Sequence, residues 1–123
     1  MANKEVVICS PVRTAIGTYG GALKDMAAVD LGAVAVRATL ERAKLSPGDI
    51  DTVVMGNVIQ AGNKMNPARQ AAIHGGIPVD VPAMTVNRVC GSGAQAIANA
   101  AQEVMLGLID SAVAGGMENM DRA

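Results

Sequence analysis

The sequence contains no tryptophan and no phenylalanine, and Tyr19 is its only aromatic residue. Half of its 123 residues are nevertheless hydrophobic, so the core must be filled by valine, isoleucine, leucine, methionine and alanine. Small side chains let helices and strands approach closely, but they bury less apolar area per residue than aromatic rings do. The length suits one domain better than two, and we expect a single domain over residues 1–123.

The sequence also lacks an excess of charge of either sign, and it has few cysteines and no long apolar run. The formal net charge is −1 with acidic and basic residues interspersed, so we expect no nucleic-acid partner and no polybasic membrane surface. Two cysteines do not make the disulfide framework of a small secreted protein, and a reducing cytoplasm is the expected compartment. The apolar runs are too short for a signal peptide or a bilayer span, so we expect no membrane partner.

Short apolar runs bounded by proline, glycine or polar residues predict buried strands, and segments rich in helix formers alternate with them. The expected strands cover residues 6–9, 52–59, 82–86 and 111–117. The expected helices cover residues 31–44, 67–74 and 94–106. The resulting β-α-β-α-β-α-β order, with crossovers of helix length, predicts an α/β layer with a mostly parallel sheet.

Local signals set the predicted helix boundaries. Asp30 is the expected N-cap of the first helix. Asn66 followed by Pro67 predicts the start of the second helix, and the glycine pair at 75–76 predicts its end. Gly107 is available to end the third helix.

A glycine-rich loop at residues 13–21 follows the first expected strand, which raises the possibility of a phosphate-binding loop. The loop has no G-x-G-x-x-G pattern, and the next helix is expected only near Asp30, so no helix N-terminus is directly available for a pyrophosphate. A structural turn that needs positive φ is the favoured interpretation.

Cys90 is expected at a sharp strand-to-helix turn within the segment NRVCGSGAQA, residues 87–96. The first N–H groups of a helix carry partial positive charge, which stabilises a thiolate and lowers the pKa of a cysteine placed there. Gly91 and Gly93 leave room for an acyl group beside the sulfur. The turn therefore predicts acyl transfer through a thioester, while a small, buried, inert cysteine remains the alternative.

A cysteine nucleophile needs a base, and His74 is the only histidine. In a parallel layer Cys90 follows its strand at the carboxyl edge, whereas His74 ends a helix that has run back to the opposite edge. At about 3.3 Å per strand residue the two are roughly 20 Å apart, too far for proton transfer. Glu118 and Asn119 are expected at the same edge as Cys90, as wall or structural hydrogen-bonding groups. The chain thus offers a sulfur without a proton-handling partner.

Four groups of residues resemble motifs of the thiolase family, in the right order and along the whole chain. They are PVRTAIG at 11–17, GNV at 56–58 with NPARQ at 66–70, VNRVCGSG at 86–93, and AGGMENM at 114–120. Two positions depart from the family pattern: Asp121 replaces the usual serine, and Ala94 replaces a frequent leucine.

The resemblance implies the incomplete N-terminal half of a thiolase-like fold, in which each half is a βαβαβαββ layer. It implies that an acyl-CoA acylates Cys90 and that the Cys90 backbone N–H contributes to an oxyanion hole. It also implies that a histidine, a second cysteine acting as acid/base and most coenzyme A contacts belong to polypeptide beyond this chain. The last strand of this half is expected to be missing as well.

The function implied is that of the nucleophile-bearing part of an acetyl-CoA C-acetyltransferase. Such an enzyme condenses two acetyl-CoA to acetoacetyl-CoA, or runs the reverse thiolysis, through an acetyl-Cys90 intermediate. Coenzyme A thioesters are then substrates, and no permanently bound cofactor or metal is expected. Expected partners are the remaining thiolase polypeptide and a twin subunit, in a homodimer or homotetramer paired through the strand from Pro82 to Arg88.

Three alternatives stay open beside this function. The first alternative is a non-catalytic assembly fragment. The second is a part of a degradative 3-ketoacyl-CoA thiolase. A condensing enzyme of the ketoacyl-synthase type is the third, and it shares the cysteine turn but matches the flanking motifs poorly.

Overall fold

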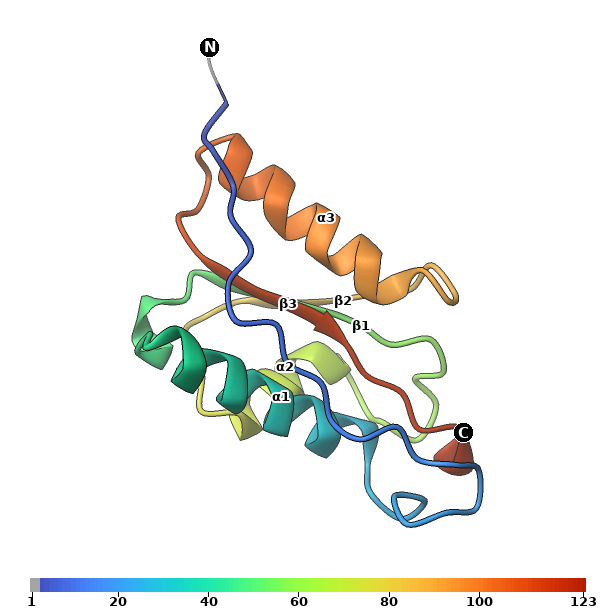
Figure 1. The fold of residues 1–123 in the computed structure, drawn as a ribbon. Helices are drawn as coiled ribbons and strands as arrows, with labels where there is room; N and C mark the ends of the chain where they lie inside the picture. The colour runs from blue at the N-terminus through green and yellow to red at the C-terminus, as the bar shows by residue number, and fades with distance from the viewer. Residues whose placement is uncertain (1–2) are drawn as a thin grey trace.

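Three parallel strands lie at the centre of the fold, in the spatial order β2-β1-β3. A computed structural model describes residues 3–123, and Figure 1 shows its helices on the two sides of this sheet. The strands are β1 (Thr52–Gly56), β2 (Ala83–Val86) and β3 (Ala112–Gly116). The helices are α1 (Ala28–Ala43), α2 (Pro67–His74) and α3 (Ser92–Met105), and the short 3-10 helices are η1 (Pro47–Asp49) and η2 (Met120–Arg122).

β1 is the central strand, and all five of its residues are buried. Its last residue, Gly56, pairs with Val86 of β2 and with Gly116 of β3, so the carboxyl ends of the three strands lie at one edge. Within the described residues β2 is an outer strand, and its side chains are only partly buried. The predicted α/β layer on a parallel sheet is therefore confirmed, although each of these strands is shorter than expected.

The two faces of the sheet are covered by different helices. α1 and α2 lie on one face and α3 lies on the other (Figure 1). Because successive strand residues point to opposite faces, Val53 and Met55 of β1 pack in the cluster that contains α1 and α2 residues. Val54 packs instead against Ala96 and Ala100 of α3. The α3 layer thus depends on alanine, as expected from a sequence poor in aromatic residues.

The helix boundaries follow local signals where tertiary packing does not compete with them. α2 begins and ends as predicted, and the Asn66 side chain accepts a hydrogen bond from a backbone N–H of its first turn. α1 begins at Ala28 without a side-chain cap, so the prediction of Asp30 as N-cap is wrong. Ala28 and Val29 are buried, and their burial extends the helix past the local capping signal. No helix within residues 3–123 combines the length and apolarity needed to cross a membrane.

Residues 6–9 do not form a strand, so the prediction of a first strand there is wrong. Val7 and Ile8 are 69% and 73% exposed. A cavity of about 520 Å³ is lined both by residues 5–9 and by β3, so the two segments do not pair. An apolar run becomes a strand only when a neighbour completes its ladder of backbone hydrogen bonds, and no described residue does so here.

The N-terminal segment is held at two points instead. The Lys4 N–H donates to the Met105 carbonyl at the end of α3, at 3.1 Å. Thr39 of α1 donates from its Oγ1 to the Ser10 carbonyl at 2.8 Å. The segment therefore crosses from the α3 layer to the α1 layer.

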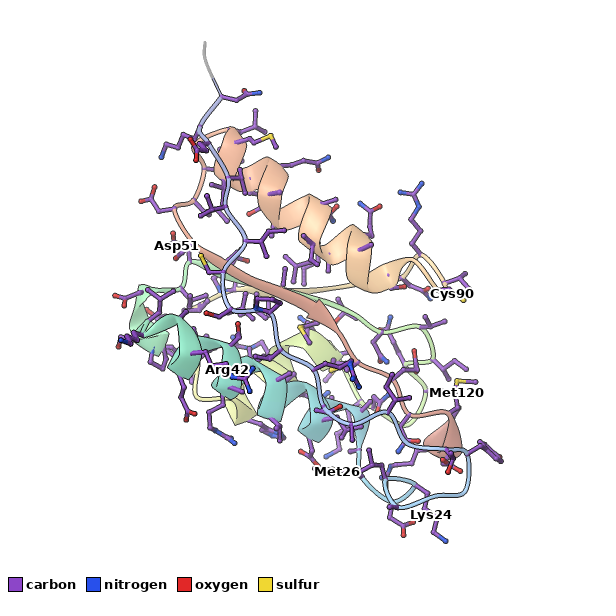
Figure 2. The ribbon with its side chains drawn as sticks, in the orientation of Figure 1. Lys24, Met26, Arg42, Asp51, Cys90 and Met120 are labelled. Atoms are coloured by element: carbon purple, nitrogen blue, oxygen red, sulfur yellow. The ribbon has the colours of Figure 1, made fainter. Side chains whose placement is uncertain are left out.

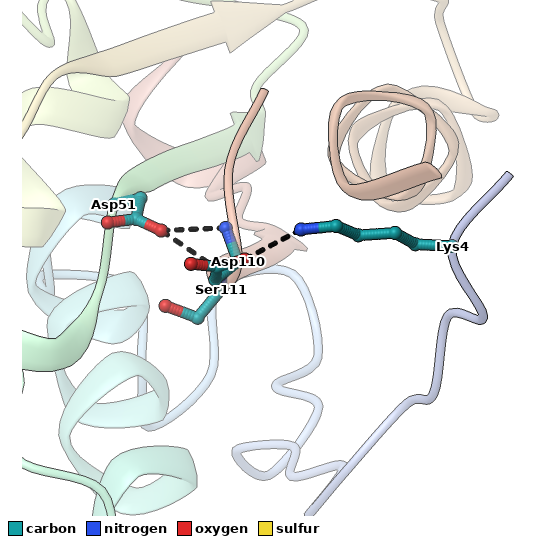
Figure 3. Close-up of polar contacts among 4 residues, drawn as sticks. All are labelled: Lys4, Asp51, Asp110 and Ser111. Atoms are coloured by element: carbon teal, nitrogen blue, oxygen red, sulfur yellow. Dashed lines mark hydrogen bonds and ion pairs between the residues drawn. The ribbon is translucent and has the colours of Figure 1, made fainter. Parts of the chain in front are cut away.

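Polar contacts join this segment to the amino-terminal end of the sheet. Lys4 Nζ lies 3.0 Å from Asp110 Oδ1, and the two exposed side chains form an ion pair (Figure 3). Beside it, the Asp51 carboxylate accepts hydrogen bonds from the backbone N–H groups of Asp110 and Ser111, at 2.8 and 3.2 Å. Asp51 precedes β1 and Cys90 follows β2, so these contacts lie at the opposite end of the sheet from Cys90 (Figure 2).

Candidate active site

Cys90 lies on the turn that joins β2 to α3, at the carboxyl edge of the sheet (Figure 2). Its side chain is exposed, so the alternative of a small buried cysteine is wrong. α3 begins at Ser92, two residues earlier than predicted, and this brings Cys90 next to the helix N-terminus. The predicted strand-to-helix turn is confirmed, with the partial positive charge of the helix N-terminus adjacent to Cys90.

The residue before Cys90 has an unusual backbone. Val89 has φ = +49°, in the left-handed region where a β-branched residue is an outlier. Asn87 Oδ1 accepts a hydrogen bond from the Val89 N–H at 3.0 Å, and Ser92 Oγ donates to the Val89 carbonyl at 2.6 Å. The sequence pattern did not indicate either role. The only sequence signal that could have indicated these roles is the presence of an asparagine and a serine around a turn, as in Asx and Ser/Thr turns.

The N-terminus of α3 is seated directly on the carboxyl ends of two strands. A Cβ at Gly56 of β1 would lie 2.6 Å from the Ser92 carbonyl carbon and 2.8 Å from the Gly93 nitrogen. A Cβ at Gly116 of β3 would lie 3.2 Å from the Gly93 Cα. Ser92 is only 4% exposed, and its Oγ accepts a hydrogen bond from the Arg88 N–H at 2.8 Å. Glycine at these strand ends therefore fixes where the helix, and with it Cys90, can lie.

Glu118 and Asn119 form structural hydrogen bonds at this edge, which agrees with one of their two predicted roles. The Glu118 carboxylate accepts from the Val58 N–H at 2.9 Å and from Asn57 Nδ2 at 3.3 Å. Asn119 Nδ2 lies within hydrogen-bond distance of three backbone carbonyls in residues 23–26. Both side chains therefore fasten loops that leave or approach the sheet.

His74 lies away from Cys90, on the other side of the sheet. Its Nδ1 is 3.3 Å from Asp30 Oδ1 of α1, and Arg37 of α1 donates to its backbone carbonyl at 2.8 Å. α2 covers the face opposite α3, so the structure agrees with the prediction that His74 is not the base (Figure 1). Within residues 3–123, no three or more histidine, cysteine, aspartate or glutamate side chains gather as a metal site.

The glycine-rich loop at 13–21 packs against the segment that follows β3. Gly20 has φ = +73°, and its N–H donates to Asp121 Oδ1 at 2.7 Å. The Gly20 N–H is therefore already bonded to the Asp121 carboxylate, and the negative charge of that carboxylate would repel a phosphate placed there. The loop geometry therefore favours the structural turn over the phosphate-binding interpretation.

The fold and the site together define an α/β domain that presents a cysteine at the carboxyl edge of a parallel sheet. The chain belongs to the thiolase family, because the family model described as the thiolase N-terminal domain matches residues 6–123. The resemblance found in the sequence motifs is thereby confirmed.

Relatives and a crystal structure agree with this assignment. Beta-ketothiolase BktB of Cupriavidus necator is 54% identical over 122 residues, which are 98% of this chain and 31% of that protein. Acetyl-CoA acetyltransferase of Escherichia coli is 52% identical over 120 residues, 98% of this chain and 30% of that protein. The Bacillus anthracis acetyl-CoA acetyltransferase superposes with a TM-score of 0.95 at 40% identity, covering 99% of this chain and 31% of that one. The chain thus spans about three tenths of the length of the curated relatives it matches.

Proposed function

We propose that this chain is the nucleophile-bearing N-terminal part of an acetyl-CoA C-acetyltransferase. In this reaction Cys90 attacks the carbonyl carbon of acetyl-CoA, coenzyme A leaves, and the acetyl group stays on the sulfur as a thioester. A second acetyl-CoA, deprotonated at its methyl group, then takes the acetyl group and gives acetoacetyl-CoA. Thiolysis is the same sequence in reverse. The observation that carries the proposal is the exposed Cys90 beside the N-terminus of α3, in a chain about half identical to named acetyl-CoA acetyltransferases.

The chain's own contribution is to hold and activate the acyl acceptor. The turn places Cys90 next to the first N–H groups of α3, which carry partial positive charge. In the tetrahedral intermediate, the negative charge moves to the former carbonyl oxygen of the substrate. The Cys90 backbone N–H is proposed to donate to that oxygen as part of an oxyanion hole.

The remaining proton transfers need groups from outside these 123 residues. The only histidine faces α1 on the far side of the sheet. The histidine that activates Cys90 and the second, acid/base cysteine are therefore proposed to come from the remaining thiolase polypeptide. Most contacts with coenzyme A are assigned there as well.

We further propose that the protein assembles as a homodimer or homotetramer through β2. This strand is an outer strand of the described sheet, and Met84 on it is 40% exposed. An apolar outer strand favours pairing with the same strand of a second copy. Both cysteines are free, which fits a reducing cytoplasm.

The chain is combined with the remaining thiolase polypeptide and incubated with acetyl-CoA, and the acetylated peptides are identified by mass spectrometry. We expect an acetyl group on Cys90 and none on Cys9, an exposed thiol outside the turn that serves as internal control. Cys90→Ser is the matched variant and should remove the label. A stable dimer that carries no label would contradict the catalytic proposal and support the alternative of a non-catalytic assembly fragment.

A degradative 3-ketoacyl-CoA thiolase is the second candidate function. The name of the Cupriavidus necator relative, a beta-ketothiolase, favours it. Labelling Cys90 with acetoacetyl-CoA and with longer 3-ketoacyl-CoA esters would separate the two. Faster labelling by the longer esters would support the degradative enzyme.

A further inference from the structure

We propose that Asn87 and Ser92 are positioning residues that hold Val89 in the left-handed conformation and thereby orient Cys90 at the N-terminus of α3. The inference rests on the proposed function, in which Cys90 is the nucleophile. Neither residue is placed in contact with substrate; each acts through the backbone of Val89.

Val89 requires an external restraint to keep its conformation. Its φ of +49° brings a β-branched side chain close to its own backbone, which valine normally avoids. Such a residue persists only where its surroundings over-determine the backbone. The Val89 side chain is 65% exposed, so apolar packing supplies little of that restraint. The restraint must come mainly from the polar contacts of its peptide groups.

Ser92 restrains the carbonyl side of Val89. Its Oγ donates to the Val89 carbonyl at 2.6 Å and accepts from the Arg88 N–H at 2.8 Å, so one hydroxyl bridges both sides of the turn. Ser92 is 4% exposed and lies against Gly56 of β1. The hydroxyl is therefore fixed by the sheet and cannot follow the turn if the turn relaxes.

Asn87 restrains the amide side of Val89. Its Oδ1 accepts from the Val89 N–H at 3.0 Å, and its Nδ2 donates to the Val58 carbonyl at 3.2 Å. Val58 is in turn held through its own N–H by the Glu118 carboxylate at 2.9 Å. A continuous series of hydrogen bonds thus joins the carboxyl ends of β3, β1 and β2 to the residue before Cys90.

The Ser92 N–H also donates to the Val89 carbonyl, at 3.1 Å, and this backbone hydrogen bond does not depend on either side chain. Loss of one of the two side-chain restraints weakens the hold on Val89 and favours its return to negative φ. That change rotates the peptide group between Val89 and Cys90, and it turns the sulfur away from the helix N-terminus. The thiol would stay exposed but would lose its fixed orientation. Reactivity of Cys90, rather than the presence of the fold, is therefore the quantity that these two side chains control.

The test compares the alkylation rates of Cys90 and Cys9 by iodoacetamide in the same molecule, measured by peptide mass spectrometry. We expect Ser92→Ala and Asn87→Ala each to lower the Cys90-to-Cys9 rate ratio by about tenfold, the effect of releasing one strained residue. Ser111→Ala is the matched control, because Ser111 donates to the Asp49 carbonyl at the far end of the sheet. That variant should leave the ratio unchanged.

Rescue separates positioning from general stability. Glycine adopts φ = +49° without strain, so adding Val89→Gly to Ser92→Ala should restore the ratio to within about twofold of the original. A merely structural serine would not be rescued by a second, flexible substitution. Unchanged ratios in both single variants, or a failed rescue, would overturn the inference. If Ser92→Ala does not fold, the exposed Asn87→Ala with its own Val89→Gly partner decides the question.

The alkylation assay does not involve acetyl-CoA, so it is independent of the proposed function. A lower Cys90-to-Cys9 alkylation ratio in the variants, together with no acetylation of Cys90 in the original chain, would uphold the positioning roles and remove the acetyltransferase proposal. Acetylation of Cys90, together with unchanged alkylation ratios in the variants, would uphold the acetyltransferase proposal and remove the positioning roles.

Discussion

Replacement of Gly56 by alanine tests whether the close contact between β1 and α3 fixes the position of Cys90. The added Cβ would lie 2.6 Å from the Ser92 carbonyl carbon and 2.7 Å from its Cβ. Carbon atoms pack at about 3.5–4.0 Å, so the first turn of α3 must retreat by roughly 1 Å. The contacting atoms belong to the first turn of a helix, and a change of side-chain rotamer cannot relieve the clash.

The expected magnitude follows from two opposing effects. Overpacking a close contact typically costs about 1–3 kcal/mol. Alanine also leaves the unfolded chain less conformational entropy than glycine does, and this stabilises the folded state by about 0.4–1 kcal/mol. We therefore expect Gly56→Ala to lower the free energy of unfolding by about 1–2 kcal/mol. With a urea slope of about 2 kcal/mol/M, the midpoint should fall by roughly 0.5–1 M.

The assay is urea unfolding of both Gly56→Ala and Gly48→Ala, together with the Cys90-to-Cys9 alkylation ratio. Gly48 is an exposed glycine with no neighbour within 4 Å of a built Cβ and no positive φ, so its variant should stay within about 0.5 kcal/mol. We expect only Gly56→Ala to lose both stability and Cys90 reactivity. Equal midpoints for the two variants would refute the argument that glycine is required at the end of β1.

Three further predictions concern other contacts. Asn66→Ala removes the α2 cap and should cost about 1–2 kcal/mol in urea unfolding. Asn57→Ala removes a fully buried amide that donates to the Met117 carbonyl, and should cost about 1–3 kcal/mol in the same assay. Met84→Lys places a charge on the outer strand β2 and should weaken self-association, measured by sedimentation; an unchanged association constant would exclude β2 as the interface.

The elements that the sequence predicts well are those whose signals are local. Asn66, Pro67 and the glycines at 75–76 lie within or beside α2, and α2 has the predicted bounds. β1 is buried along its whole length, so its apolar run matches its environment. The position of Cys90 was predictable for the same reason, because a strand, a glycine-rich turn and an alanine-rich helix follow one another directly.

The wrong predictions concern features that depend on distant partners. The apolar run at 6–9 has the composition of a strand, but a strand also needs a neighbour, and composition does not reveal whether one is present. Asp30 is a good capping residue, but the burial of Ala28 and Val29 decides where α1 begins. Both errors come from reading a local preference without the tertiary contact that overrides it.

The geometry that orients Cys90 was not predictable in detail. Valine is among the residues least expected at positive φ, so Val89 gives no sequence signal of its left-handed conformation. The roles of Asn87 and Ser92 emerge only when their side chains are seen on the two peptide groups of Val89. The sequence thus located Cys90 on its turn but not the side chains that hydrogen-bond to the backbone of Val89.

The scarcity of aromatic residues and the placement of Cys90 have a common physical cause. α3 buries Ser92, Ala96 and Ala100, one small residue per turn, against a sheet whose strand ends include Gly56 and Gly116. Larger side chains at these positions would bury more area, but they would also hold the helix farther from the sheet. The Ser92 hydroxyl bridges the turn only because its helix lies this close to β1. The close contact made by these small residues is therefore required to orient the cysteine. Because it buries little apolar area, most of the stability from apolar burial must come from the α1 and α2 side of the sheet.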